Sequence, residues 1–299
     1  MEIVKPTVDV AIICYNEFDG LKETVESVLS QSYVINTVLL SDDGSGKRFP
    51  SEITKLFDGA PCQLIVRHGE KNLGTVAHMN AAATLLSSMY IKFLSPSDTF
   101  SDCDALKSLV EFAWEKQAEV VSSQCVICNR ENYEQYFRYP DALRLRVLRK
   151  TGNSLFTFLS IKNGISMVGS LFSRSFFNHM GFDESYKYLE DWPTWLKLAR
   201  NGSDIPVLPR VTTFYPLGGA SSKDGNAYHS QLLHADMCLC YEKEILPYYD
   251  RFPRIARKII SYRYACLSNV NGEKLLRKFP ALYLIDVLER KVKKLLTKS

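Results

Sequence analysis

Hydrophobic and polar positions in the first half of the chain alternate between a strand pattern and a helix pattern. Residues 8–14 form a nearly continuous apolar run of strand length, and Leu21, Val25, Val28 and Leu29 then recur at helical spacing. The same succession predicts strands over residues 34–40, 63–67, 90–94 and 119–127, and helices over residues 75–88 and 103–116. Strands that alternate with helices favour an α/β fold with a doubly wound, mostly parallel sheet.

The second half of the chain is less regular. A helix is predicted over residues 193–200, one or two short strands over 205–215, and a loop rich in Gly and Ser over 217–226. Beyond that loop the pattern is helical. In the last segment, six apolar residues fall on one stripe of a helix and the basic residues lie off it: Leu282, Ile285, Leu288, Val292, Leu295 and Leu296. We therefore expect an amphipathic, basic helix in this segment.

The composition is that of a globular protein. The 299 residues are 46% hydrophobic and 23% charged, which excludes disordered and fibrous classes. No run approaches the ~18 apolar residues that a membrane-spanning helix needs, and Glu2, Lys5 and Asp9 interrupt any signal-peptide core. Eight cysteines are too few at this length for a disulfide scaffold. We therefore expect a cytoplasmic protein with reduced thiols.

The net charge of +4 is unevenly distributed along the chain. Residues 251–299 contain 13 Lys or Arg against three Asp or Glu, whereas the first 250 residues contain 24 against 30. An acidic body is thus followed by a basic helical segment. Two interpretations of this segment compete: peripheral docking on the anionic inner face of a membrane, or packing on the body with the charges in water. Nucleic acid is not an expected partner, because no known recognition pattern is present.

Polar residues follow three of the predicted strands, at the edge where ligands bind in open α/β sheets. Tyr15-Asn16-Glu17 follows the first strand, Asp42-Asp43 the second, and Ser95-Pro96-Ser97-Asp98 the fourth. No G-x-G-x-x-G follows the first strand, and no G-x-x-x-x-G-K-[ST] occurs in the chain. The sequence therefore lacks the motifs that would most strongly indicate dinucleotide-dependent redox chemistry or P-loop chemistry.

Four sequence blocks occur in order between residues 7 and 222. They are residues 8–16, Val38-Leu39-Leu40-Ser41-Asp42-Asp43-Gly44-Ser45, Asn72-Leu73-Gly74 with Ala77 and Asn80, and Gly181-Phe182-Asp183-Glu184 with Glu190-Asp191. In this order and spacing they resemble the inverting nucleotide-sugar transferases of glycosyltransferase family two, which have the GT-A fold. The resemblance implies a GT-A-like domain over residues 1–222, followed by a helical basic region over residues 223–299.

The resemblance also implies a site for the donor. Tyr15 is expected to pack against the nucleobase, and Asp43 to accept a hydrogen bond from the base or the ribose. An aromatic face and a carboxylate at adjacent strand ends are suited to stack on and orient a nucleoside. Asp42 and Asp43 also form a turn sequence, so Asp42 is open to a purely structural role. The other residues assigned to the donor site are Asn16, Glu17, Asn72, Gly74, Asp98 and Lys223.

Asp191 is the residue that the resemblance assigns as general base. In an inverting displacement a carboxylate removes the proton of the acceptor hydroxyl as that hydroxyl attacks the anomeric carbon. Asp191 lies two residues before Pro193, so it is also expected to cap the helix that follows. Glu190 is expected to orient the acceptor or the loop. Trp192 and Trp195 are candidates for an acceptor-sugar site, with the hydrophobic core as the alternative.

The largest departure from the family pattern is at the metal site. The family's D-x-D-D motif normally holds a divalent cation, but here the sequence reads Ser95-Pro96-Ser97-Asp98 and keeps one carboxylate. Serine hydroxyls are poor substitutes for carboxylates around Mg²⁺ or Mn²⁺. Either Asp98 holds the metal alone, or a cationic side chain replaces it. Lys223 in the loop is the candidate for the second alternative.

These observations predict an inverting, non-processive glycosyltransferase. It would move one sugar from a nucleotide diphosphate sugar, with UDP as the first choice of nucleotide, to a saccharide or lipid-linked saccharide in surface polysaccharide assembly. No Q-x-x-R-W follows Asp191, which argues against a processive polymerase. The alternative is a non-catalytic homologue that keeps the nucleoside site and binds a nucleotide sugar or a partner transferase. The incomplete D-x-D motif agrees with that alternative.

Overall fold

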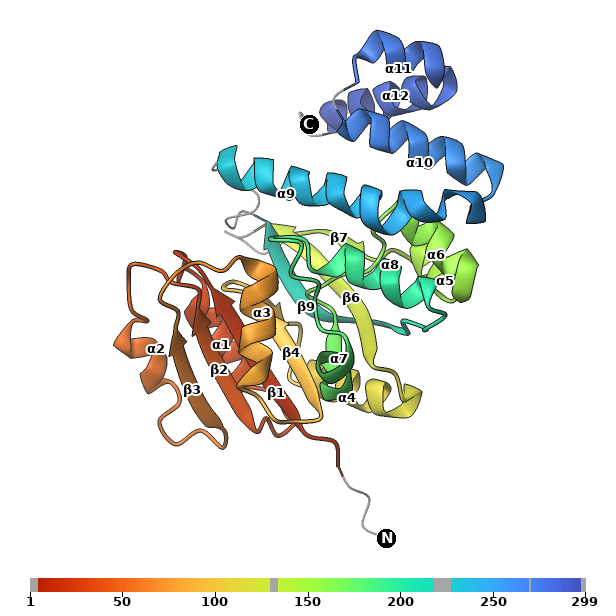
Figure 1. Ribbon diagram of the computed structural model, residues 1–299. Coiled ribbons are helices and arrows are strands. Elements are labelled where there is room, and N and C mark those ends of the chain that lie inside the picture. Colours follow the sequence, from red (N-terminus) through yellow and green to blue (C-terminus); the bar gives the residue numbers. More distant parts are fainter. Residues whose placement is uncertain (1–4, 130–133, 218–226, 269, 297–299) are drawn as a thin grey trace.

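The computed structural model describes residues 5–129, 134–217, 227–268 and 270–296 (Figure 1). Nine strands in this part form one sheet, with the order β3-β2-β1-β4-β8-β6-β9-β5 and with β7 paired to β6. The strands are β1 (Val8–Cys14), β2 (Thr37–Asp42), β3 (Gln63–His68), β4 (Tyr90–Leu94), β5 (Thr99–Phe100), β6 (Val120–Asn129), β7 (Gln135–Tyr139), β8 (Leu171–Ser173) and β9 (Val207–Leu217). Lys223 lies outside the described residues.

The first four strands are parallel, as the sequence predicts. β1 lies between β2 and β4, with Ala11 level with Leu39 on one side and with Phe93 on the other. The side chains of β1 and β2 are nearly all buried, which explains their unbroken apolar runs. The predicted second strand, over residues 34–40, was placed three residues too early. Val34 is 61% exposed and belongs to the connection before β2.

The other half of the sheet is mixed. β8 runs antiparallel to both β4 and β6, and β7 and β5 are antiparallel to β6 and β9, whereas β9 is parallel to β6. The predicted α/β class is therefore confirmed, but a mostly parallel sheet is correct only for the first half. The second half carried an irregular sequence pattern, and its two longest strands, β6 and β9, pair across a long connection.

Helices cover both faces of the sheet. Successive residues of β1 enter different cores: Val10 and Ile12 belong to one hydrophobic cluster and Ala11 to the other. The α-helices are α1 (Leu21–Leu29), α2 (Ser51–Lys55), α3 (Thr75–Thr84), α4 (Ala105–Lys116), α5 (Ala142–Leu148), α6 (Gly152–Ile161), α7 (Arg174–His179), α8 (Asp191–Arg200), α9 (Ala227–Cys240), α10 (Arg254–Leu267), α11 (Gly272–Lys278) and α12 (Pro280–Leu296). A π-helical turn (Tyr241–Ile245) and a 3₁₀ segment (Leu246–Arg251) connect α9 to α10.

Much of the region after residue 222 packs into the core of the preceding domain. Its residues Tyr241, Ile245, Phe252 and Ile260 belong to the same hydrophobic cluster as Ala11. Figure 1 shows α9 running across α8 and α6, with α10, α11 and α12 stacked beyond it. The hydrophobic core therefore continues across the predicted division at residue 222.

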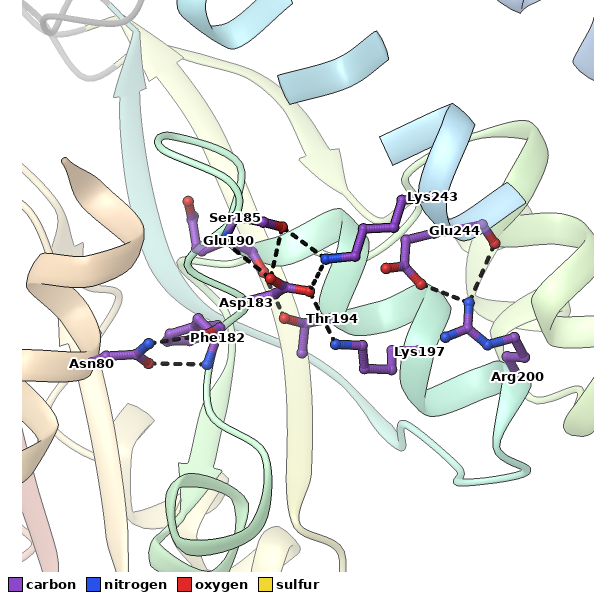
Figure 2. Close-up of polar contacts among 10 residues, drawn as sticks. All are labelled: Asn80, Phe182, Asp183, Ser185, Glu190, Thr194, Lys197, Arg200, Lys243 and Glu244. Atoms are coloured by element: carbon purple, nitrogen blue, oxygen red, sulfur yellow. Dashed lines mark hydrogen bonds and ion pairs between the residues drawn. The ribbon is translucent and has the colours of Figure 1, made fainter. Parts of the chain in front are cut away.

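Two ion pairs reinforce this packing (Figure 2). Arg200 at the end of α8 binds Glu244 of the π-helical turn with 2.6 Å between Nη1 and Oε2, and both side chains are largely buried. Lys243 of the same turn binds Asp183 with 2.7 Å between Nζ and Oδ2. The body and the C-terminal helices are thus joined by charge as well as by apolar contact.

Helices α11 and α12 form a smaller cluster of their own. Tyr262 of α10 packs with Leu275 and Phe279, and its hydroxyl donates to Asp286 over 3.0 Å. On the rest of α12, large apolar side chains stay open to solvent, each more than half exposed: Leu284, Ile285 and Leu288. Within the residues that the structure describes, no helix is both long and apolar enough to span a membrane.

Candidate active site

A cavity of about 380 Å³ lies at the carboxyl ends of β1 and β4. After β1 the chain adds β2 and β3 on one side, and it then returns to the other side of β1 as β4. The cavity therefore lies where the strand order reverses, the usual ligand position in such sheets. Its lining residues are Ile13, Thr75, Met79, Phe93, Leu94, Ser95, Asp98, Cys125, Ile127, Tyr139, Asn163, Ile165, Ser166, Met167, Val168, Tyr188, Glu190, Asp191 and Tyr215.

Three carboxylates predicted from two separate parts of the sequence meet in this cavity. Asp98 comes from the turn after β4, whereas Glu190 and Asp191 come from the start of α8. Thr75, which follows the predicted donor residue Gly74, lines the same space. The fold thus brings together residues that are about a hundred positions apart in the chain.

Asp191 is the first residue of α8 and not its cap. Glu190 occupies the capping position with helical backbone angles, and its side chain makes no capping hydrogen bond. Pro193 is tolerated because the first turn of a helix needs no intrahelical N–H partner. The predicted capping role of Asp191 is therefore wrong by one position. Its carboxylate instead accepts hydrogen bonds from Asn163 Nδ2 over 2.8 Å and from the Trp192 N–H over 2.5 Å.

Glu190 and Asp191 influence each other's ionisation. Burial raises the pKa of Glu190, and the charge of Asp191 raises it further, to about 8. Burial also raises the pKa of Asp191, against the hydrogen bonds from Asn163 and Trp192 that favour its ionised form. The hydrogen bonds from Asn163 and Trp192 favour the ionised form of Asp191, whereas its charge favours the protonated form of Glu190. This arrangement places a proton acceptor beside a proton donor.

The turn after β4 has little capacity for a metal ion. The Ser95 N–H donates to Asp98 Oδ2 over 2.8 Å, and Ser97 Oγ donates to the Asp19 carbonyl over 3.3 Å. Burial raises the pKa of Asp98 to about 7, which weakens it as an anionic ligand. Among the described residues, no group of three or more His, Cys, Asp or Glu side chains is placed to hold a metal. Asp98 as the metal ligand and a cationic side chain in place of the metal both stay predictions, and the proposed reaction uses no step through a metal.

Lys92 is a buried cation beneath the cavity that the sequence prediction missed. It is 0% exposed, and its ammonium donates to the carbonyls of Phe93 over 3.1 Å and Val168 over 2.5 Å. Burial lowers the pKa of Lys92 to about 8, against the opposite effect of the Asp98 charge. A lysine within an otherwise apolar strand was the available signal, because buried lysines are rare.

Asp42 and Asp43 hold the loops of the predicted donor site. Asp43 accepts hydrogen bonds from the backbone N–H groups of Leu73 and Gly74, each at 3.0 Å. Asp42 accepts from the Ser45 N–H over 3.0 Å and from its hydroxyl. The second and third sequence blocks are therefore joined through Asp43. Its contact with a base or ribose stays a prediction.

The other predicted donor residues surround this junction. Tyr15 is 36% exposed directly after β1, and the Asn16 N–H donates to Ser45 Oγ over 2.7 Å. Glu17 and Asn72 are partly exposed on the neighbouring loops. None of these four lines the cavity itself, whose nearest residue on β1 is Ile13. Their contact with a nucleotide also stays a prediction.

Gly74 is required by its surroundings. It has a φ of +88°, which L-residues with a side chain rarely adopt, and a Cβ there would lie 2.9 Å from the Lys187 carbonyl oxygen. The Val76 N–H donates to that same carbonyl over 3.3 Å. The start of α3 is therefore in close contact with the loop that leads to Glu190.

Trp192 and Trp195 are core residues, which corrects their prediction as acceptor-site residues. They are 5% and 0% exposed, and neither lines the cavity. The Trp192 indole N–H donates to the Leu159 carbonyl over 2.7 Å, and the Trp195 ring stacks on Phe172. The first turns of α8 direct both rings toward the sheet and α6, because the apolar face of the helix is buried there.

Several cavity residues carried no recognisable sequence signal. They come from β7, from the connection before β8, from the loop before α8 and from β9, where the sequence pattern is irregular: Tyr139, Asn163, Ser166, Tyr188 and Tyr215. Aromatic, amide and hydroxyl side chains such as these are common in sugar-binding pockets and also in ordinary loops. Only the fold shows that they surround the same space.

Comparison with known proteins places the chain in a family. It matches the model of glycosyl transferase family 2 over residues 9–181, more than half of its length. It is 25% identical to an uncharacterized glycosyltransferase of Rickettsia prowazekii (strain Madrid E) over 205 residues, which are 67% of this chain and 61% of the relative. The uncharacterized glycosyltransferase YwdF of Bacillus subtilis (strain 168) is 24% identical over 229 residues, 76% of this chain and 81% of the relative. The chain thus spans about three fifths of the Rickettsia relative.

Solved structures agree on the fold. Mannosyltransferase PcManGT from Pyrobaculum calidifontis, in complex with GDP-Man and Mn²⁺, has a TM-score of 0.62 at 19% identity, covering 99% of this chain and 80% of that chain. S. aureus TarS 1–349 in complex with UDP-GlcNAc has a TM-score of 0.55 at 14% identity, covering 89% and 82%. This likeness confirms the predicted GT-A-like α/β fold. By the family match, the chain belongs to glycosyl transferase family 2.

Proposed function

We propose that the protein transfers one sugar from a nucleotide diphosphate sugar to a saccharide or lipid-linked saccharide, with inversion and without processive elongation. The observation that carries this proposal is the meeting of Asp98, Glu190 and Asp191 in one cavity at the switch point of the sheet. Solved structures of the same fold contain UDP-GlcNAc and GDP-Man, which supports a nucleotide sugar as donor. UDP is our first choice of nucleotide, and assembly of a surface polysaccharide is the proposed role.

In the proposed reaction, Asp191 acts as the general base. The acceptor hydroxyl attacks the anomeric carbon, and the bond from that carbon to the phosphate oxygen breaks. The hydroxyl proton passes to Asp191, and the bonding electrons leave with the nucleoside diphosphate. Asn163 holds the Asp191 carboxylate through a hydrogen bond of 2.8 Å. Burial and the Asp191 charge raise the pKa of Glu190, and in its protonated form Glu190 can donate a hydrogen bond to the acceptor.

Turnover with a panel of donors tests this function. We expect the wild-type protein to release nucleoside diphosphate from a UDP-sugar faster than from the matching GDP-sugar when a saccharide acceptor is present. If a cationic side chain takes the place of the divalent cation, turnover should fall less than tenfold in EDTA. Lys223 remains the predicted cation at the diphosphate.

Turnover together with a binding assay separates the glycosyltransferase from the non-catalytic homologue. Binding of a nucleotide sugar in a thermal-shift assay, without turnover of any donor and acceptor pair, would favour the non-catalytic homologue. Strong inhibition by EDTA with recovery in Mn²⁺ would instead show that the reaction needs a divalent cation, with Asp98 as its predicted ligand.

We also propose that α12 contacts an anionic membrane surface. Leu284, Ile285 and Leu288 are more than half exposed, and basic residues are frequent in the same segment. An amphipathic helix with this composition is suited to the lipid interface. A lipid-linked acceptor would then be reached at the membrane, on its inner face.

Vesicle binding tests the membrane proposal. Replacing Leu284, Ile285 and Leu288 together with Gln should lower cosedimentation with phosphatidylglycerol vesicles by about tenfold or more, because the buried apolar area is lost. Neutral phosphatidylcholine vesicles are the control and should bind wild type weakly. Equal binding of the variant and wild type to anionic vesicles would contradict the proposal.

A further inference from the structure

The loop that leads into α8 is held by one carboxylate from the C-terminal helices. Asp236 of α9 is 6% exposed, and its Oδ2 accepts hydrogen bonds from three successive backbone N–H groups. They belong to Lys187 at 2.9 Å, Tyr188 at 2.6 Å and Leu189 at 3.2 Å. Hydrogen bonds to a charged acceptor are stronger than neutral ones, and three on one oxygen fix the path of the backbone.

This loop carries the chemistry of the cavity. Tyr188, Glu190 and Asp191 all line the cavity, and they lie within or directly after the three residues that Asp236 binds. The opposite side of the loop is in contact with the start of α3, where the Val76 N–H donates to the Lys187 carbonyl. The loop is therefore held between the third sequence block and α9.

Other contacts of the C-terminal region act elsewhere on α8. Glu244 binds Arg200, the last residue of the helix (Figure 2). Lys243 binds Asp183, which also lies 3.3 Å from Lys197 within the helix (Figure 2). These contacts hold the body of the helix against the π-helical turn. Asp236 is different because it acts on the backbone immediately before the two carboxylates. Its effect should therefore be separable from general docking of the C-terminal helices.

We propose that Asp236 is a positioning residue for the glycosyl transfer, which fixes the 187–189 backbone so that Glu190 and Asp191 face the cavity. The inference rests on the proposed function for its catalytic part. It gives α9 a role in the active site, although α9 lies outside the region matched by the family model. The Asp236 charge also contributes to the raised pKa of Glu190, behind burial and the Asp191 charge.

The test compares two substitutions at Asp236 with one nearby. In Asp236→Asn the shape is kept and the charge is lost, whereas in Asp236→Leu every hydrogen bond of the carboxylate is lost. We expect kcat to fall about tenfold in the first and about a hundredfold in the second, because small displacements of reacting groups have large effects on rate. The KM for the donor should change less than threefold. Glu244→Gln, the control, weakens the C-terminal docking and should keep kcat within twofold of wild type at a temperature where it is folded.

Hydrogen exchange gives a readout that does not depend on activity. The amides of residues 187–189 should be protected in wild type and in Glu244→Gln, and they should exchange at least tenfold faster in Asp236→Leu. A wild-type protein that shows this protection but no turnover would overturn the proposed function. The hydrogen bonds between Asp236 and residues 187–189 would still be supported. Unchanged exchange of these amides in Asp236→Leu, or a folded Asp236→Leu with wild-type kcat, would overturn the positioning role.

Discussion

Replacing Asp191 with Asn is expected to lower kcat by about 10²–10⁴-fold, the usual contribution of a general base. The amide keeps the size of the carboxyl group and can still accept the hydrogen bond from Asn163. It cannot take a proton from the acceptor hydroxyl. Nucleotide affinity should stay within about twofold, because the predicted nucleotide contacts lie on the loops after β1 and β2. Steady-state kinetics with titration of the nucleotide measures both quantities.

The control for Asp191→Asn is Asp204→Asn. Asp204 is an exposed carboxylate just beyond the end of α8, so its loss changes the net charge equally without touching the cavity. We expect this variant to keep wild-type kcat. Wild-type turnover in Asp191→Asn would remove Asp191 as the base, and an equal loss in both variants would point to a general effect of charge.

Replacing Arg200 with Met is expected to lower the free energy of unfolding by about 3–5 kcal/mol, the usual result of breaking a buried ion pair. The Glu244 carboxyl has a side-chain exposure of 2%, and Arg200 Nη1 lies 2.6 Å from its Oε2. Without the guanidinium, Glu244 would be left buried and unpaired. Urea denaturation followed by circular dichroism gives the change, provided the transition stays two-state.

Two further variants test whether the unpaired Glu244 charge causes this loss of stability. Arg200→Met combined with Glu244→Met should recover most of the lost stability, because replacing both partners removes the unpaired charge. Lys22→Met breaks an exposed ion pair with Glu26 on α1, which should cost no more than about 0.5 kcal/mol. A loss below about 1 kcal/mol in Arg200→Met would mean that water solvates Glu244 in the native state.

The parts of the fold that could be predicted from the sequence are those with a local signature. Strands β1 and β4 have the predicted bounds because buried parallel strands read as continuous apolar runs. Glu190 and Asp191 could be selected because they occupy an ordered family block, and Asp98 because it is the one carboxylate that remains at the D-x-D-D position. The order of the strands brings these three carboxylates into one cavity. From the sequence, only the family resemblance indicates that they meet.

The parts that could not be predicted depend on long-range contacts. Trp192 and Trp195 have aromatic rings of the kind that can stack on a sugar, but the face of α8 that carries them is buried. The apolar strand around Lys92 marks this lysine as unusual, but it does not predict which groups the ammonium contacts. Asp236 lies in a segment whose sequence shows a helix and nothing of the loop that it binds. Hydrophobic periodicity identifies elements, and it does not identify which elements meet.

The shared core between the sheet and the C-terminal helices has a consequence for synthesis on the ribosome. Domains fold as units from the N-terminus as they emerge, and residues 9–181 contain β1–β4 with the predicted nucleotide loops. Glu190 and Asp191 emerge later, and their loop gains its Asp236 contact only once α9 has followed. A nascent chain would thus complete the predicted nucleotide loops after β1, β2 and β3 before its proposed general base is held in place, so an unfinished chain would lack the chemistry of transfer.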